Sequence, residues 1–101
     1  MFEVQFTPEA RDQLASIYRY IAHHGSPDAA RRYTNAIISD CERLAEAPFR
    51  GNRRDDIRPG LRTTHYKGRT IIAFAVDEAK RCVFIVGLFY GGQDYERALG
   101  D

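Results

Sequence analysis

The longest uncharged stretch of the chain predicts the central strand of a sheet. Cys82–Tyr90 has the sequence CVFIVGLFY, nine residues rich in Val, Ile and Phe. It is too short to cross a membrane and too β-branched for a stable helix, so it is typical of a strand buried on both faces. A second apolar run, Arg69–Val76, precedes it, with the charged segment 77–81 between them. The two runs therefore predict a β-hairpin with a short exposed loop.

The first half of the chain predicts a strand followed by two helices. Phe2, Val4 and Phe6 alternate with polar residues, the period of a half-buried strand. At 7–9 and again at 26–28, a hydroxyl residue, a proline and an acid mark a helix start. We expect Gly25 to end the first helix in a left-handed conformation and Pro48 to mark the end of the second. Apolar residues recur at helical spacing in both segments: Ala10, Leu14, Ile17 and Ile21, then Ala30, Tyr33, Ile37, Cys41 and Leu44.

These elements together predict an α+β fold. The two helices have a very short link, so they must form an antiparallel hairpin, and we assign Tyr18, Tyr20 and Tyr33 to helix packing. Leu61–Tyr66 predicts a strand that turns at Lys67-Gly68 into the next one. We expect one domain over residues 1–101 with the order β-α-α-β-β-β. It combines an N-terminal strand and a three-stranded C-terminal meander in an antiparallel sheet, with the helical hairpin packed on one face. The spacing of Tyr95 and Leu99 predicts a final helical turn or a tail.

Composition narrows the class of protein. Hydrophobic residues make up 44% of the chain and charged residues 29%, as in folded globular domains. The first residues do not resemble a signal peptide and no apolar run has bilayer length, so we expect a cytoplasmic protein without a membrane span. Cys41 and Cys82 lie far apart, which predicts two buried reduced thiols. The cysteines and histidines lack metal-ligand spacing and no glycine-rich phosphate loop occurs, so we expect no metal and no cofactor.

Basic residues concentrate in one segment. Residues 50–69 contain seven Arg and Lys against two Asp, whereas the whole chain has a net charge of +1. Such a segment can attract an anionic partner, although a solvated strand edge has the same composition. Arginine and tyrosine side chains bind phosphates and bases, and they equally anchor protein interfaces. His23 and His24 suit the end of the first helix, where cations complement the helix dipole, which leaves His65 as the only histidine near the meander.

Several motifs resemble the RelE/ParE superfamily of type II toxins, and the resemblance covers essentially the whole chain. They are the TPEA helix start, the segment LAEAPFRGNRRDDIRPGLR, the hairpin strand GRTIIAFAVD and the ending FYGGQDYE. The most specific parts are Asp56–Arg62 and Phe89–Glu96. The resemblance implies a toxin of a type II toxin-antitoxin system, acting in plasmid or chromosomal maintenance and neutralised by a co-encoded antitoxin in a hetero-oligomer.

Two activities are associated with that superfamily. RelE-like members cleave mRNA in the ribosomal A site, and ParE-like members inhibit DNA gyrase and so replication. RelE-type nucleases usually carry a basic residue after the last strand, whereas this chain has no Arg or Lys between Tyr90 and Arg97 and retains only Lys67 of the lysine-rich segment. The resemblance therefore favours gyrase inhibition. The alternatives are a ribosome-dependent mRNA endonuclease and a binding module without toxicity. The nuclease site would use Arg62, His65, Arg69 and Tyr95.

The resemblance also implies where partners bind. The antitoxin is expected to be ParD-like, with an acidic C-terminal segment laid across the sheet face that the helices leave open. Arg58 and Arg62 would pair with its carboxylates. The residues expected to bind antitoxin or target are Arg58, Arg62, Tyr66, Lys67, Arg69, Phe74, Phe89, Tyr90, Gln93, Asp94 and Tyr95.

Overall fold

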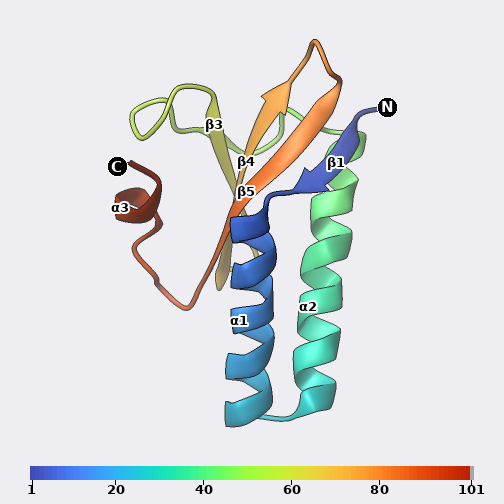
Figure 1. The fold of residues 1–101 in the computed structure, drawn as a ribbon, viewed down its shortest axis with the longest axis vertical. Coiled ribbons are helices and arrows are strands. Elements are labelled where there is room, and N and C mark those ends of the chain that lie inside the picture. Colours follow the sequence, from blue (N-terminus) through green and yellow to red (C-terminus); the bar gives the residue numbers. More distant parts are fainter. Residues whose placement is uncertain (101) are drawn as a thin grey trace.

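The predicted order of helices and strands is present in the structure, a computed structural model that describes residues 1–100. The α+β class is confirmed (Figure 1). The elements are β1 (Glu3–Phe6), α1 (Pro8–His24), α2 (Pro27–Glu42), the 3-10 turn η1 (Arg43–Ala45), β2 (Asn52–Arg53), β3 (Leu61–Tyr66), β4 (Thr70–Asp77), β5 (Cys82–Tyr90) and α3 (Tyr95–Gly100).

The strands form one sheet in the order β1-β5-β4-β3-β2. β5 lies between β1 and β4, which confirms it as an interior strand, and β3, β4 and β5 form the antiparallel meander. The expectation of an antiparallel sheet is wrong for β1, which pairs with β5 in parallel from Glu3–Cys82 to Phe6–Ile85. The long connection between them allows this direction. The two-residue strand β2, which pairs with β3, was not predicted.

Local capping chemistry sets the helix ends. The Thr7 and Ser26 hydroxyl oxygens accept hydrogen bonds from the backbone N–H groups of Ala10 and Ala29, at 3.2 and 3.0 Å, as predicted for N-caps. Gly25 ends α1, but the expected left-handed conformation is wrong, since its φ is −134°. The chain reverses within Gly25 and Ser26, and Ser26 is already extended as the cap of α2. The predicted turn at Lys67-Gly68 is confirmed, with φ of 51° and 68°.

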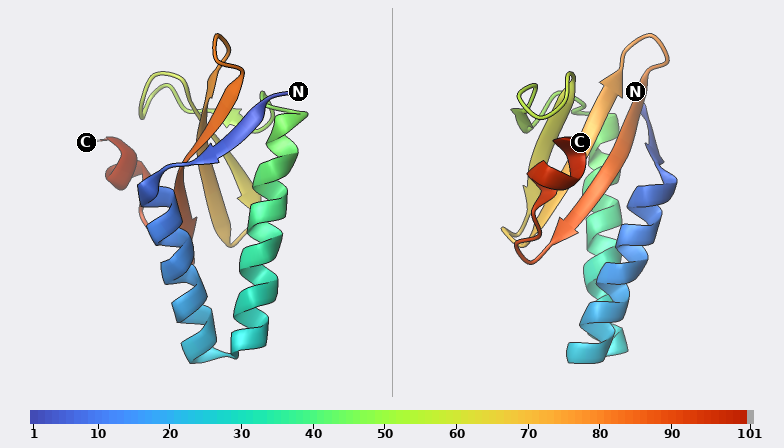
Figure 2. Two further views of the ribbon diagram at one scale, coloured as in Figure 1. Left: turned by 45° about the vertical axis from the view of Figure 1, so that its right-hand side comes forward. Right: turned by 60° about the vertical axis from the view of Figure 1, so that its left-hand side comes forward.

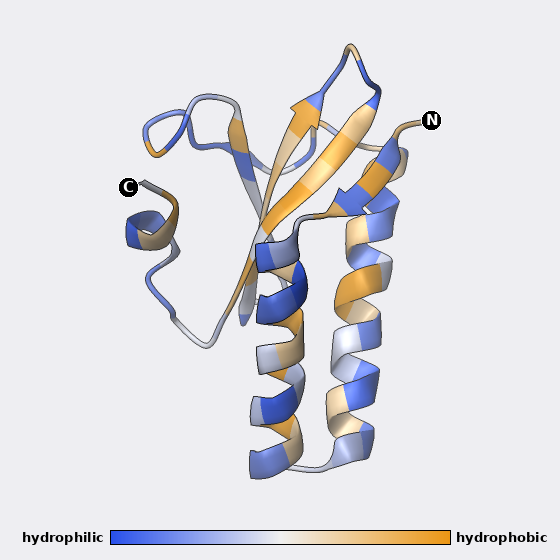
Figure 3. Ribbon diagram, in the orientation of Figure 1, coloured by the Kyte–Doolittle hydropathy of each residue, from blue (hydrophilic) through white to orange (hydrophobic). Residues whose placement is uncertain are grey.

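The helical hairpin covers one face of the sheet, and α3 lies on the other (Figure 2). The larger core lies between the hairpin and the sheet, where Ile37, Leu44, Phe74 and Ile85 are fully buried. A smaller cluster on the α3 face contains Leu61, Ala73, Phe89 and Leu99. Figure 3 shows the corresponding pattern, with apolar β4 and β5 and mostly polar outer helix surfaces.

Both cysteines are free and buried, as predicted. Burial, reinforced by the neighbouring Asp40 carboxylate, raises the pKa of the Cys41 thiol from 9.0 to about 12. Burial also raises the pKa of Cys82. Neither thiol is therefore positioned as a nucleophile, because the reactive form of cysteine is the thiolate.

Candidate partner-binding site

Arg54 ties the basic segment to α3. Its guanidinium donates two hydrogen bonds of 3.0 Å to the carboxylate of Asp56 and one of 2.7 Å to the hydroxyl oxygen of Tyr95, and it also bonds to Glu96. The two carboxylates raise the pKa of Arg54, and Arg54 in turn lowers the pKa of Asp56. Most N–H donors of the Arg54 guanidinium are therefore occupied by bonds within the chain.

Arg58 and Arg62 each use part of their donor capacity on the backbone. A terminal nitrogen of Arg58 donates to the carbonyl oxygen of Leu99 at 2.9 Å, and one of Arg62 donates to that of Phe49 at 2.8 Å. The Arg62 guanidinium also lies 5.4 Å from the centre of the Phe49 ring. Because a guanidinium has five N–H donors, both arginines keep donors for a carboxylate.

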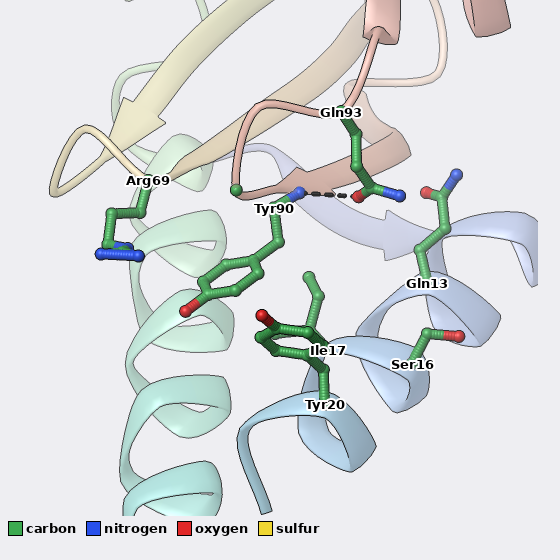
Figure 4. A pocket seen from close by; sticks show the side chains of 8 residues that line it. Gln13, Ser16, Ile17, Tyr20, Arg69, Tyr90 and Gln93 are labelled. Atoms are coloured by element: carbon green, nitrogen blue, oxygen red, sulfur yellow. Dashed lines mark hydrogen bonds between the residues drawn. The ribbon is translucent and has the colours of Figure 1, made fainter. Parts of the chain in front are cut away.

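A cleft with a volume of about 420 Å³ opens between α1 and the end of β5. Tyr20 and Tyr90 supply its aromatic walls, with ring centres 5.8 Å apart, and the Arg69 guanidinium lies 5.7 Å from the centre of the Tyr90 ring. Figure 4 shows Arg69 beside Tyr90, and Gln13 and Gln93 at the opposite end. The lining residues are Gln13, Ser16, Ile17, Tyr20, Arg69, Tyr90, Gly91 and Gln93.

Three tyrosines, Tyr33, Tyr66 and Tyr90, form a cluster next to this cleft. The ring of Tyr33, on α2, lies 5.3 Å from that of Tyr66 and 5.6 Å from that of Tyr90, both edge-on. Its hydroxyl is 2.7 Å from the hydroxyl oxygen of Thr70, which is fully buried in β4. Burial raises the pKa of Tyr33. The cluster therefore joins α2 to the strand ends that carry the cleft.

A second hollow, of about 270 Å³, lies on the α3 face of β5. Val86 and Phe89 form its sheet side, α1 contributes Gln13, and Leu99 borders it from α3. Arg58 and Glu9 also line it, so this hollow carries one charge of each sign. Gln13 thus lines both hollows and marks the boundary between them.

The four residues suggested for RNA cleavage are not brought together. Arg62 lies opposite Phe74, whose side chain is in the larger core, whereas His65 lies opposite Ile71, which packs in the smaller cluster on the other face. Tyr95 also packs in the smaller cluster, and its hydroxyl is bound to Arg54. Arg69 directly follows the turn between β3 and β4, and its guanidinium lies near the Tyr90 ring.

The remaining predicted contact residues differ in accessibility. Phe74 is fully buried and Phe89 is only 6% exposed, so both mainly pack the sheet. Lys67, in the turn, lies 5.9 Å from the centre of the Tyr66 ring. Asp94 begins α3 by accepting a hydrogen bond of 3.2 Å from the N–H of Arg97. Gln93 accepts one of 2.8 Å from the N–H of Tyr90.

The sequence analysis missed the cleft residues that come from α1, of which Tyr20 and Gln13 are the most informative. Tyr20 is 53% exposed and stacks on His24, so assigning it to helix packing is wrong, and Tyr18, at 36% exposure, is likewise on the surface. Gln13 was not singled out, because it flanks the apolar stripe of α1. The available signal was the helical row formed by Gln13, Ile17, Tyr20 and His24, which combines amide, apolar and aromatic side chains.

Within residues 1–100, no three His, Cys, Asp or Glu side chains gather as they would around a metal ion. None of the helices described combines the length and apolar character needed to span a bilayer.

Comparison with known families assigns the chain to a family. Residues 4–95 match the model of the ParE toxin of type II toxin-antitoxin systems. The chain belongs to the ParE toxin family. No curated protein matched it by sequence.

Solved structures share the ParE fold at low sequence identity. A chain from the chromosomal ParDE toxin-antitoxin system of P. aeruginosa has a TM-score of 0.77 and 21% identity, with 90% of this chain and 97% of that one covered. A chain from the RelBE2 toxin-antitoxin complex of Mycobacterium tuberculosis has a TM-score of 0.65 and 18% identity, with 88% and 96% covered. The isolated RelE toxin of E. coli gives 0.57 and 13%, with 97% and 95% covered.

Proposed function

We propose that this chain is the toxin of a type II toxin-antitoxin system, that it inhibits DNA gyrase, and that a co-encoded antitoxin neutralises it. The observation that carries the proposal is the match to the ParE toxin model over residues 4–95. The similarity to a chain of a ParDE system supports the antitoxin as a partner.

The geometry of the described residues agrees with action through surface contacts. Arg62 and His65, two of the residues suggested for RNA cleavage, lie on opposite faces of the sheet, so they do not share a phosphate site. A general base must be within hydrogen-bond reach of the proton it takes, and the opposite placement of His65 and Arg62 does not favour joint action on one phosphate. Arginines and tyrosines at the surface instead suit recognition of a macromolecule.

Parallel assays with the purified protein test the proposal. We expect the chain to inhibit gyrase supercoiling and to leave mRNA intact on programmed ribosomes. Expression without the antitoxin should arrest growth, and coexpression should restore it. Codon-end mRNA cleavage with normal supercoiling would overturn the gyrase assignment, and growth without arrest would overturn toxicity.

A further inference from the structure

A pair of phenylalanines lies at the end of the molecule that carries the N-terminus. The rings of Phe2 and Phe49 meet edge to face, with their centres 6.3 Å apart. The Phe2 N–H donates to the carbonyl oxygen of Ala45 at 2.9 Å, which holds Phe2 beside η1, and Figure 1 shows the N-terminus next to the end of α2. Phe2 packs on the larger core, whereas Phe49 is 49% exposed. The fold therefore leaves a large apolar side chain uncovered at this end.

Two arginines extend the pair, one on each side. The Arg81 guanidinium lies 4.6 Å from the centre of the Phe2 ring, and the Arg62 guanidinium lies 5.4 Å from that of the Phe49 ring. Neither arginine makes an ion pair with the residues that the structure describes. We call the row formed by Arg81, Phe2, Phe49 and Arg62 the Phe49 surface. It combines exposed apolar area with two positive charges.

Three contacts hold Phe49 in its position. The preceding Pro48 is buried, and the Arg50 N–H closes the turn by donating to the carbonyl oxygen of Ala47 at 3.3 Å. The Phe49 carbonyl oxygen accepts a bond of 2.8 Å from Arg62, whose guanidinium also lies over the ring. A partner would therefore meet a ring that is already in place, which lowers the entropic cost of association.

The residue types of the Phe49 surface are those of a protein interface. Aromatic residues and arginine are enriched at the centres of protein–protein interfaces, and their truncation causes the largest losses of affinity. A nucleic-acid site would need open aromatic faces on which bases stack, whereas here a guanidinium already lies over each ring. The two arginines favour a partner that carries carboxylates around an apolar pocket.

The Phe49 surface lies away from the face where the antitoxin is expected. Phe2 packs in the core under the helical hairpin, and Arg62 lies opposite Phe74 of that core. The smaller cluster and α3 lie on the other face of the sheet (Figure 2). An antitoxin segment on the α3 face would thus leave the Phe49 ring open to a different protein.

We propose that the toxin binds its target protein through the Phe49 surface. Phe49 enters an apolar pocket of the target, and Arg81 pairs with a carboxylate at the rim of that pocket. This inference rests on the proposed function for the identity of the target as gyrase. It assigns the target and the antitoxin to different parts of the toxin.

Phe49→Ala and Arg81→Gln test the two kinds of contact. The toxin concentration that half-inhibits gyrase supercoiling should rise by about tenfold or more for Phe49→Ala and by about threefold for Arg81→Gln, whereas their affinities for the antitoxin should change less than about twofold. Tyr18→Ala removes an exposed ring from α1 and Arg32→Gln an exposed charge from α2, so these matched controls should change neither quantity. Arg62 is left unchanged because it is also expected to contact the antitoxin.

A photoreactive residue would locate the contact directly. The crosslinker p-benzoylphenylalanine at position 49 should attach to a gyrase subunit in a mixture of toxin, gyrase and DNA, and the same residue at position 18 should not. Full inhibition by Phe49→Ala, or crosslinking to DNA or to a second copy of the toxin instead of gyrase, would overturn the proposed surface. An equal loss of antitoxin affinity would assign the surface to the antitoxin and overturn it too. If the unchanged chain does not inhibit gyrase, the proposed function itself fails.

Discussion

The hydrogen bond between Tyr33 and Thr70 should stabilise the strand ends that carry the cleft. Tyr33→Phe removes the partner of a fully buried hydroxyl. A net hydrogen bond contributes about 0.5–1.5 kcal/mol and an unpaired buried group costs about 1–3 kcal/mol. Because the Tyr33 side chain is only half-buried and water can partly reach the site, we expect a loss of about 1–2 kcal/mol in the free energy of unfolding.

Thr70→Val should cost less, about 0.5–1 kcal/mol, because the Tyr33 hydroxyl can turn to water and the new side chain has the same shape. Once Thr70 is Val, Tyr33→Phe should add little, so the double mutant should show a coupling energy of about 1 kcal/mol. Urea unfolding followed by circular dichroism measures all four proteins, and the denaturant slope should stay constant.

Tyr18→Phe is the control, because Tyr18 is a surface residue of α1 and its change should stay within about 0.5 kcal/mol. For a domain of this size, a loss of 1 kcal/mol corresponds to a fall in Tm of about 4–8 °C. The reasoning is refuted if Tyr33→Phe costs no more than Tyr18→Phe, or if the losses for Tyr33→Phe and Thr70→Val simply add.

Three further predictions concern the core, the buried thiol and the basic segment. Phe74→Ala should lower the free energy of unfolding by about 3–5 kcal/mol, since it opens a cavity in the larger core; a loss below 1 kcal/mol in urea unfolding would contradict this. The raised pKa of Cys41 keeps its thiol neutral in the fold, so the stability it contributes is complete below pH 9 and lost between pH 9 and about 12. The loss is about 1.4 kcal/mol at pH 10 and should disappear from the pH profile of Cys41→Ala. Arg58→Glu combined with Arg62→Glu should weaken antitoxin binding at least tenfold, and the affinity of the unchanged chain should fall with salt; calorimetry at two salt concentrations checks both.

The fold was largely predictable because its signals are local. The caps at Thr7 and Ser26, the turn at Lys67-Gly68 and the apolar run of β5 each depend on a few adjacent residues. The parallel pairing of β1 could not be obtained this way. Alternation shows that a strand exists and which residues share a face, but its direction and its neighbour depend on residues far along the chain.

The cleft was predicted only in part, for the same reason. Arg69 and Tyr90 were named because charged and aromatic residues beside the turn and the strand end are visible in the sequence, and Gln93 was named through the ending FYGGQDYE, which carries the family resemblance. Gln13 and Tyr20 come from α1, and only the packing of that helix against β5 places them at the site. The sequence analysis included Arg54 only as one of the basic residues of segment 50–69. Its ion pair with Glu96 could not be predicted, because Glu96 lies in α3, far along the chain.

The parallel pairing of β1 with β5 has a consequence for synthesis. The partner of Glu3 is Cys82, so β1 has no strand to pair with until synthesis has passed β5. The helical hairpin, made early, has no sheet to cover until β4 and β5 arrive. A product that ends before β5 therefore lacks the strand that joins β1 to the rest of the sheet.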